Sequence, residues 1–245
     1  MKTAALVAAL LAPTACWALV GIKWKFEKKP SGGLKDVTFR INMADAPHVS
    51  GFCFAQQFKF HGVSKVGYIG LQPREDNVGG SVVRGVFSSL QKGSNSSHPN
   101  CHNGADGADG VSCAVDVNAS YSPTYNLVVE NISGRTWRGT LADPSSGQET
   151  VIGEWSLPSG ARGIKSSQRG FVEYHLWNSN KKKPPSCGKL PKTQVMFGKP
   201  TTRTGGAGSG SVGDAYQHGD CKGKVAFKTS RISHTGGGAK VNVGF

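Results

Sequence analysis

Residues 36–43 read DVTFRINM, and apolar and polar side chains alternate along this stretch. Val37, Phe39, Ile41 and Met43 share one side, and Asp36, Thr38, Arg40 and Asn42 share the other. Successive side chains of a strand point to opposite faces, so the pattern predicts a strand with one buried face. Similar short runs recur at 52–60, 66–71, 82–90, 125–130, 136–141, 150–157, 170–177, 193–197, 224–229 and 239–243. The chain therefore reads as all-β, an antiparallel β-sandwich or jelly roll.

The first eighteen residues predict a cleaved secretory signal. Lys2 precedes the apolar run 4–11, and small residues lead to a cut after Ala18. That run is too short to span a bilayer. We expect residues 19–33 to form an N-terminal extension or edge strand, and 34–245 to form a single sandwich domain. The mature protein would be secreted and extracellular, without a membrane span.

The six cysteines indicate a disulfide-stapled secreted protein. Cys101 and Cys113 bracket the glycine-rich stretch CHNGADGADGVSC, which predicts a tight, irregular loop closed by a local disulfide. Cys187 and Cys221 are the second predicted pair, which leaves Cys53 in neither. The sequence alone leaves this connectivity open.

Asp106 and Asp109 lie within the glycine-rich stretch and allow two interpretations. Carboxylates and loop carbonyls are ligands that calcium prefers, although their spacing is not that of an EF-hand. Aspartates also close turns on their own backbone. We expect a turn-rich stapled loop and no cofactor, with calcium as the alternative.

Three Asn-x-Ser sequons, at Asn95, Asn118 and Asn131, surround the same region. In a secreted eukaryotic protein each would be a glycosylation site on the surface.

The chain is basic, with 29 Lys and Arg residues against 15 Asp and Glu residues and a formal net charge of +14. Such a protein is attracted to acidic polysaccharide, anionic lipid headgroups or nucleic acid. No helix with a basic face and no aromatic–basic array occurs, which disfavours nucleic acid. The lysine clusters at 23–29 and 181–183 read as solvated surface.

Four segments in order resemble the DUF3472 family of secreted bacterial and fungal proteins, with 170–175 continuing in the manner of its fungal members. The segments are GYIGLQPR (67–74), the glycine-rich loop ending at Cys113, YNLVV (125–129) with Trp137 following, and IGEW (152–155). In relatives that loop more often carries a Gly-Gly-Glu-Gly-like run, where this chain has Asp106 and Asp109. The resemblance implies a secreted β-sandwich that binds or processes sugars.

Residues 171–177 suggest a ligand-binding platform. On one strand, Glu173, His175 and Trp177 would share a face, where an indole could stack on a sugar ring beside two polar groups. Cross-strand pairing on a solvated face is the alternative.

The sequence favours a non-enzymatic binding protein that recognises polysaccharide or glycan. Serine-hydrolase and papain-like motifs are absent, and no spacing singles out a carboxylate pair among Glu130, Glu154 and Glu173. One alternative is a secreted effector that inhibits an extracellular protein of another organism, such as a protease, through loops 181–187 and 201–213. Another is a polysaccharide lyase or hydrolase.

Overall fold

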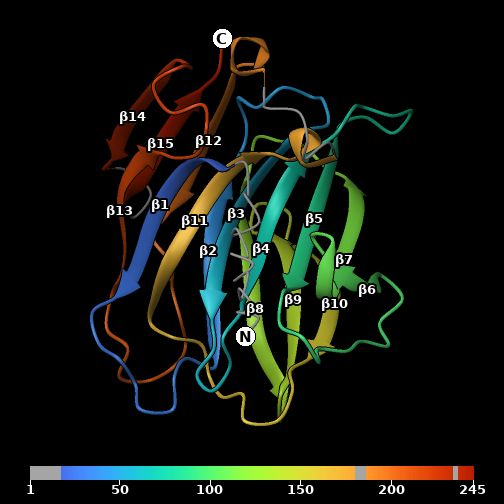
Figure 1. Cartoon of the computed structure of the whole chain (residues 1–245), viewed down its shortest axis with the longest axis vertical. Helices are drawn as coiled ribbons and strands as arrows, with labels where there is room; N and C mark the ends of the chain where they lie inside the picture. Colours follow the sequence, from blue (N-terminus) through green and yellow to red (C-terminus); the bar gives the residue numbers. More distant parts are fainter. Residues whose placement is uncertain (1–17, 180–185, 234–236) are drawn as a thin grey trace, which may run out of the picture.

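The computed structural model describes residues 18–179, 186–233 and 237–245. Of the predicted signal peptide 1–18, residues 1–17 lie outside them, and Ala18 is the first residue of a strand. The expectation of an antiparallel β-sandwich is confirmed, because fifteen described strands form two antiparallel sheets (Figure 1). Two short 3-10 helices, η1 (His175–Ser179) and η2 (Cys187–Lys189), complete the described elements. None of the described helices is long and apolar enough to cross a membrane.

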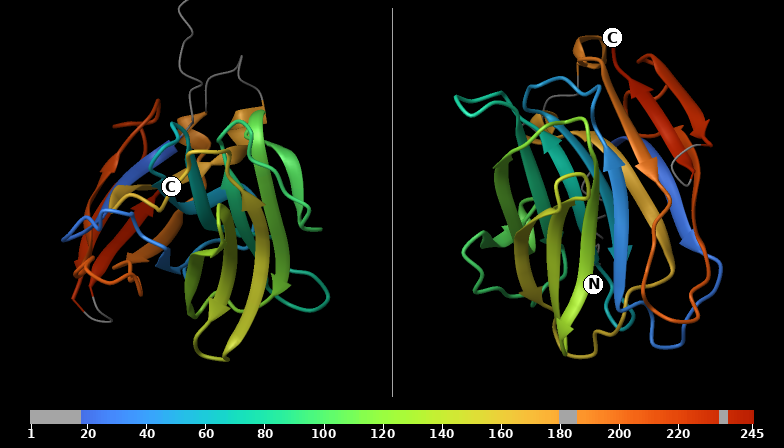
Figure 2. Two further views of the ribbon diagram at one scale, coloured as in Figure 1. Left: turned by 90° about the horizontal axis from the view of Figure 1, so that it is seen from below. Right: turned by 180° about the vertical axis from the view of Figure 1, so that it is seen from behind.

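Figure 2 shows the two sheets as stacked layers. In spatial order the eight-stranded sheet contains β13 (Gly210–Gln217), β1 (Ala18–Phe26), β11 (Ser167–Tyr174), β3 (Phe52–Lys59), β4 (Val66–Pro73), β5 (Val82–Ser89), β7 (Ala108–Asn118) and β6 (Cys101–Ala105). The seven-stranded sheet contains β10 (Gln148–Ser156), β9 (Thr136–Asp143), β8 (Thr124–Ser133), β2 (Asp36–Asn42), β12 (Thr193–Gly198), β15 (Gly238–Val243) and β14 (Phe227–Ile232).

Aromatic side chains fill the space between the sheets. Phe39 of β2 lies 5.1 Å from Trp24 of β1 between ring centroids, and Phe58 of β3 stacks on Trp155 of β10 at 6.5 Å. All four side chains are almost fully buried. Each pair joins one sheet to the other. The apolar side chains of the alternating pattern thus form a core between the sheets, and each sheet keeps an outer face that points away from the other sheet.

The N-terminal segment differs from the expected extension or edge strand. β1 lies inside the eight-stranded sheet, between β13 and β11. Its residues 21–26 read GIKWKF, and Ile22, Trp24 and Phe26 are buried in the core. β13 lies beyond β1 and is the edge strand on this side of the sheet.

The expected flexible loop 201–213 is anchored rather than free. The Thr202 and Thr204 hydroxyls and the Arg203 backbone N–H donate hydrogen bonds to the carboxylate of Asp36, which is buried. The segment then enters β13 at Gly210. A carboxylate removed from water needs such partners, so it fixes the loop to the body of the sandwich. Residues 181–185 of the other loop named for the effector interpretation lie outside the described residues, and that interpretation stays a prediction.

The prediction of an irregular loop between Cys101 and Cys113 is wrong, because this stretch forms the β6–β7 hairpin. Asp106 and Gly107 supply the turn with φ values of 51° and 76°, as a tight Asp-Gly hairpin requires. Cys101 and Cys113 face each other in register and form the expected disulfide, with Cα atoms 4.0 Å apart. The Cys187–Cys221 disulfide is confirmed too, and Cys53 lies buried in β3 outside both bridges.

Candidate functional site

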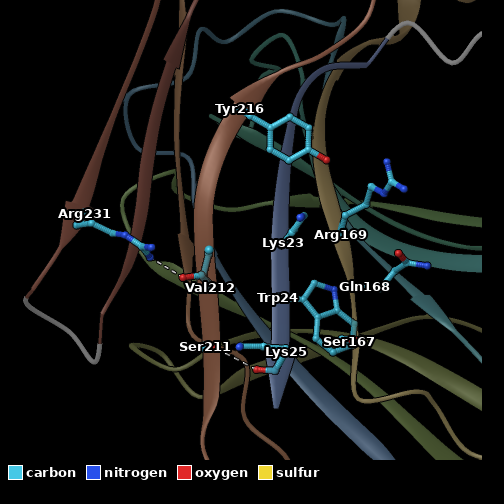
Figure 3. A pocket seen from close by; sticks show the side chains of 11 residues that line it. Lys23, Trp24, Lys25, Ser167, Gln168, Arg169, Ser211, Val212, Tyr216 and Arg231 are labelled. Carbon is cyan, nitrogen blue, oxygen red and sulfur yellow. Dashed lines mark hydrogen bonds between the residues drawn. The ribbon is translucent and has the colours of Figure 1, made fainter. Parts of the chain in front are cut away.

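A groove of about 1070 Å³ runs along the outer face of the eight-stranded sheet over β13, β1 and β11 (Figure 3). The polar and charged side chains in its lining are Lys23, Lys25, Ser167, Gln168, Arg169, Ser211, Tyr216 and Arg231. None of the described residues that line it is acidic. We call this surface the basic groove.

The basic groove gathers positive charge that the described part of the chain leaves unneutralised. Lys23 of β1 lies directly opposite Arg169 of β11, and Lys25 follows on the same face of β1. No ion pair within the described residues involves any of these three side chains. Like charges placed opposite each other on neighbouring strands destabilise a sheet. Folding alone therefore gives no reason for this arrangement.

Arg231 has a different role in the groove. Its guanidinium lies 2.9 Å from the Asp214 carboxylate and donates a hydrogen bond to the carbonyl oxygen of Val212. Figure 3 shows it at the margin of the site, beyond β13. The ion pair neutralises this arginine, which therefore lines the groove without adding free positive charge.

An aromatic ring lies beside the unneutralised cations. Tyr216 reaches from β13 across β1, with its hydroxyl end towards β11 (Figure 3). A Cβ atom at Gly21 would overlap this ring, so glycine at that position lets the ring lie against the strand. The result is a half-buried ring at the groove surface, next to Lys23 and Arg169.

A second hollow of about 270 Å³ continues the groove towards the middle of the sheet. It shares Gln168, Arg169 and Tyr216 with the groove and adds Lys59 and His218 to the lining. The combined surface offers further hydrogen-bonding groups and one more cation, and its described lining again contains no acidic side chain. An extended anionic ligand could contact both parts.

The predicted platform residues Glu173, His175 and Trp177 do not share one strand. β11 ends at Tyr174, where η1 begins with His175, whose N–H donates to the carbonyl oxygen of Gly51. Trp177 packs edge-on against Tyr174, with ring centroids 5.1 Å apart. Only Glu173 of the three residues therefore lies on β11, and the other two belong to η1.

The two polar members of that platform lie in different surroundings. Glu173 is buried and lies opposite Cys53 of β3, on the same outer face as the groove. Burial lowers the pKa of the His175 imidazole, and the nearby Arg84 charge lowers it further. His175 is therefore neutral at physiological pH. A ligand-binding role for Glu173, His175 and Trp177 stays a prediction.

Asp106 and Asp109, the predicted calcium ligands, have separate partners. The Tyr68 hydroxyl donates to Asp106 at 3.1 Å, whereas Asp109 lies 3.5 Å from the Lys92 ammonium. Within the described ranges no group of three His, Cys, Asp or Glu side chains is arranged to hold a metal ion. Burial raises the pKa of the Asp106 carboxyl, and the hydrogen bond from Tyr68 partly offsets that rise.

The sequence interpretation missed the groove residues, although one signal for them was present. In GIKWKF (21–26) the two lysines alternate with buried apolar residues, which places both on one outer face. Arg169 and Tyr216 carried no comparable signal. Their proximity depends on the register of β1 with β11 and β13, which local sequence does not specify.

No protein-family model and no curated protein matches the sequence, so the resemblance to the DUF3472 family stays a prediction. Among solved structures, Scytalido-glutamic peptidase with a peptide-based transition state analogue is 12% identical, with a TM-score of 0.46, over 94% of this chain and 100% of that one. SCP-B, an eqolisin-family peptidase in complex with the tripeptide Ala-Ile-His, is 12% identical over the same shares, with a TM-score of 0.41. At these values the likeness assigns no activity to this chain.

Proposed function

We propose that this protein is a secreted binding protein that holds an anionic polysaccharide in the basic groove. The observation that carries the proposal is the like-charged pair Lys23 and Arg169, which face each other beside Tyr216 with no acidic residue in the described part of the lining. Such an arrangement lowers the stability of the free protein, and a polyanion reverses that effect when it binds.

Each group in the groove has a role in this binding mode. The guanidinium of Arg169 can bind a uronate carboxylate or a sulfate through two parallel hydrogen bonds. Lys23 and Lys25 supply point charges along the same face. The ring of Tyr216 can stack on the apolar face of a sugar, and Gln168 and Ser167 can bond hydroxyl groups.

The groove favours polysaccharide over single-stranded nucleic acid. Proteins that bind single strands stack successive bases on several aromatic side chains. The basic groove carries a single ring at its polar surface, Tyr216, because the Trp24 side chain is buried in the core. One stacking position among several cations suits a charged sugar chain.

The direct test is retention on immobilised polysaccharide. We expect the wild-type chain to bind polygalacturonate and heparin beads at low salt and to pass through beads of a neutral glucan. Lys23→Gln and Arg169→Gln should each weaken retention, because each removes one contact to an anionic group. Arg135→Gln, an equal charge change at the exposed β8–β9 turn, is the matched control and should bind like wild type.

Two outcomes would contradict the proposal. One is equal retention of wild type, Lys23→Gln and Arg169→Gln, which would place binding elsewhere on the chain. The other is displacement by an unstructured oligonucleotide as efficient as displacement by soluble polygalacturonate of equal charge, which would indicate unselective binding of polyanions.

Hydrolysis of the bound polysaccharide is a second candidate function, and one observation favours it. The pKa of the Asp106 carboxyl is raised above its ordinary value, which is the direction that a general acid requires. Glu173 would be the second carboxyl on the same outer face. Release of reducing ends from polygalacturonate, lost in Asp106→Asn and Glu173→Gln, would establish this activity. Binding without product release would exclude it.

A further inference from the structure

A separate hollow of about 260 Å³ lies on the outer face of the other, seven-stranded sheet. Its lining includes Arg40 of β2, Asn126 of β8, Met196 and Gly198 of β12, Ile232 of β14, and Pro144 after β9. It shares no residue with the basic groove. We call it the Arg40 hollow.

Strand register explains why the sheet is hollowed at this point. Asn126 pairs with Arg40, Gly198 pairs with Gly238, and Ile232 pairs with Gly238 from the other side. A Cβ atom at Gly198 would lie 2.9 Å from the Cβ of Arg40. Gly198 and Gly238 therefore occupy neighbouring positions between Arg40 and Ile232. Gly198 lines the hollow, and the absence of its side chain leaves space beside Arg40.

The charge of the hollow indicates an anion. Arg40 is half-buried, and no ion pair within the described residues involves its guanidinium. None of the described residues that line it is acidic. The neighbouring cation, Lys240, instead lies 3.9 Å from Asp45. A partly desolvated arginine without a counter-ion is a strong site for a carboxylate, which it can bind through two hydrogen bonds.

The other lining residues indicate that the anionic ligand also carries an apolar group. Met196, Ile232 and Pro144 present aliphatic surface, and the amide of Asn126 lies next to Arg40 as an additional hydrogen-bonding group. Sites for drug-sized ligands span about 300–1,000 Å³. The hollow lies just below that range, so it suits a compact molecule rather than a polymer.

We propose that the Arg40 hollow binds a small monocarboxylic acid with a branched or aromatic apolar body. The carboxylate lies on the guanidinium of Arg40, and the apolar body packs against Met196 and Ile232. The same chemistry is present in a free acid and in the C-terminal residue of a peptide. This site is independent of the basic groove and of its proposed function.

Calorimetric titration of the full chain with 4-methylpentanoate and benzoate tests the proposal, with 4-methylpentanamide as the neutral analogue. The acids should bind at least about tenfold more tightly than the amide, a difference of about 1.4 kcal/mol. A tripeptide ending in leucine, with a free or amidated C-terminus, identifies the source. Tighter binding of the free-ended peptide than of the free acid indicates a chain end, and the reverse order indicates a free metabolite.

Two variants separate the charge from the cavity. Arg40→Gln should lose at least about tenfold in affinity for the acid while still being retained on polygalacturonate. Ile232→Trp keeps the charge but fills the hollow from the edge strand β14, and it should also lose the acid. Arg135→Gln should bind like wild type. Equal affinity for acid and amide, or unchanged binding by Arg40→Gln, would overturn the proposal.

Discussion

Lys23 of β1 lies directly opposite Arg169 of β11, so two positive side chains face each other on the outer face of the eight-stranded sheet. Opposite-charge cross-strand pairs stabilise a sheet by about 0.2–1 kcal/mol, and like charges have the opposite effect. Functional sites often lower stability in this way, and the proposed polysaccharide site gives this pair such a role.

Arg169→Glu should therefore change stability and binding in opposite directions. Glutamate would form an ion pair with Lys23, so we expect the free energy of unfolding to rise by about 0.5 kcal/mol. Retention on polygalacturonate should be lost. Urea denaturation and bead binding measure the two effects. A less stable variant, or one that still binds, would show that the pair does not have the role proposed.

Most strands could be predicted from sequence, because alternation is local information, and the short separation of Cys101 and Cys113 favoured their pairing. The Cys187–Cys221 pair, 34 residues apart, was expected but could not be fixed by sequence alone. Alternation along 36–43 predicts β2 whatever its neighbours are. The β6–β7 hairpin was missed because its glycines and aspartates were interpreted as an irregular loop. The alternating Val111, Cys113, Val115 and Val117 of β7 were a usable strand signal.

The basic groove could not be predicted in the same way, because only the register of the strands brings its residues together. Lys23, Arg169 and Tyr216 are far apart in the chain and meet only when β1 pairs with both β11 and β13. A shift of one residue in either pairing would turn their side chains to the opposite face. Nothing local in the sequence specifies those pairings.

Gly21→Ala tests the contact between Gly21 and the Tyr216 ring. The added Cβ atom would overlap the ring and displace it. Overpacking of this kind typically destabilises a protein by about 1–3 kcal/mol, and we expect weaker polysaccharide retention as well. Tyr216→Phe should keep both properties. The double variant Gly21→Ala/Tyr216→Ala should regain stability but not binding; recovery of binding would show that the ring has no part in it.

Asp106→Asn should raise stability at neutral pH but not at acidic pH. A carboxyl whose pKa is raised on folding stabilises the folded state at low pH, and that contribution is lost as the pH rises above its ordinary value of 3.8 and through the folded value. Asparagine still accepts the Tyr68 hydrogen bond and also tolerates the positive φ at this turn. Thermal unfolding measured at several pH values tests this expectation. A variant whose advantage is equal at pH 3 and pH 7 would contradict it.

Gly153→Ala should destabilise the sandwich through the Cys101–Cys113 disulfide. A Cβ atom at Gly153 of β10 would lie 2.5 Å from the Cys101 sulfur and 2.6 Å from the Cys113 sulfur. We expect a loss of about 1–3 kcal/mol in the free energy of unfolding, measured in urea. Gly205→Ala, where no atom lies within 4 Å of the added carbon, is the control and should change stability by less than about 0.5 kcal/mol. Equal effects of the two substitutions would exclude contact with the disulfide as the cause.

Two of the three predicted glycosylation sites, Asn95 and Asn131, should differ in occupancy. The side-chain nitrogen of Asn131 donates hydrogen bonds to the carbonyl oxygens of Gly134 and Thr136, whereas Asn95 is exposed. Attachment of a glycan requires that nitrogen. Peptide mass spectrometry after expression in a eukaryotic secretory host should find Asn95 occupied and Asn131 largely unmodified. The reverse order would contradict the expectation.

The salt dependence of binding to a defined acidic oligosaccharide is the most direct test of the basic groove. Isothermal titration with an oligogalacturonate at rising ionic strength should show steadily falling affinity, because salt screens the contacts of Lys23, Lys25 and Arg169. The double variant Lys23→Gln/Arg169→Gln should bind more weakly and show a shallower salt dependence, while Arg135→Gln follows wild type. An affinity that is independent of salt, or a double variant with the slope of wild type, would contradict the account.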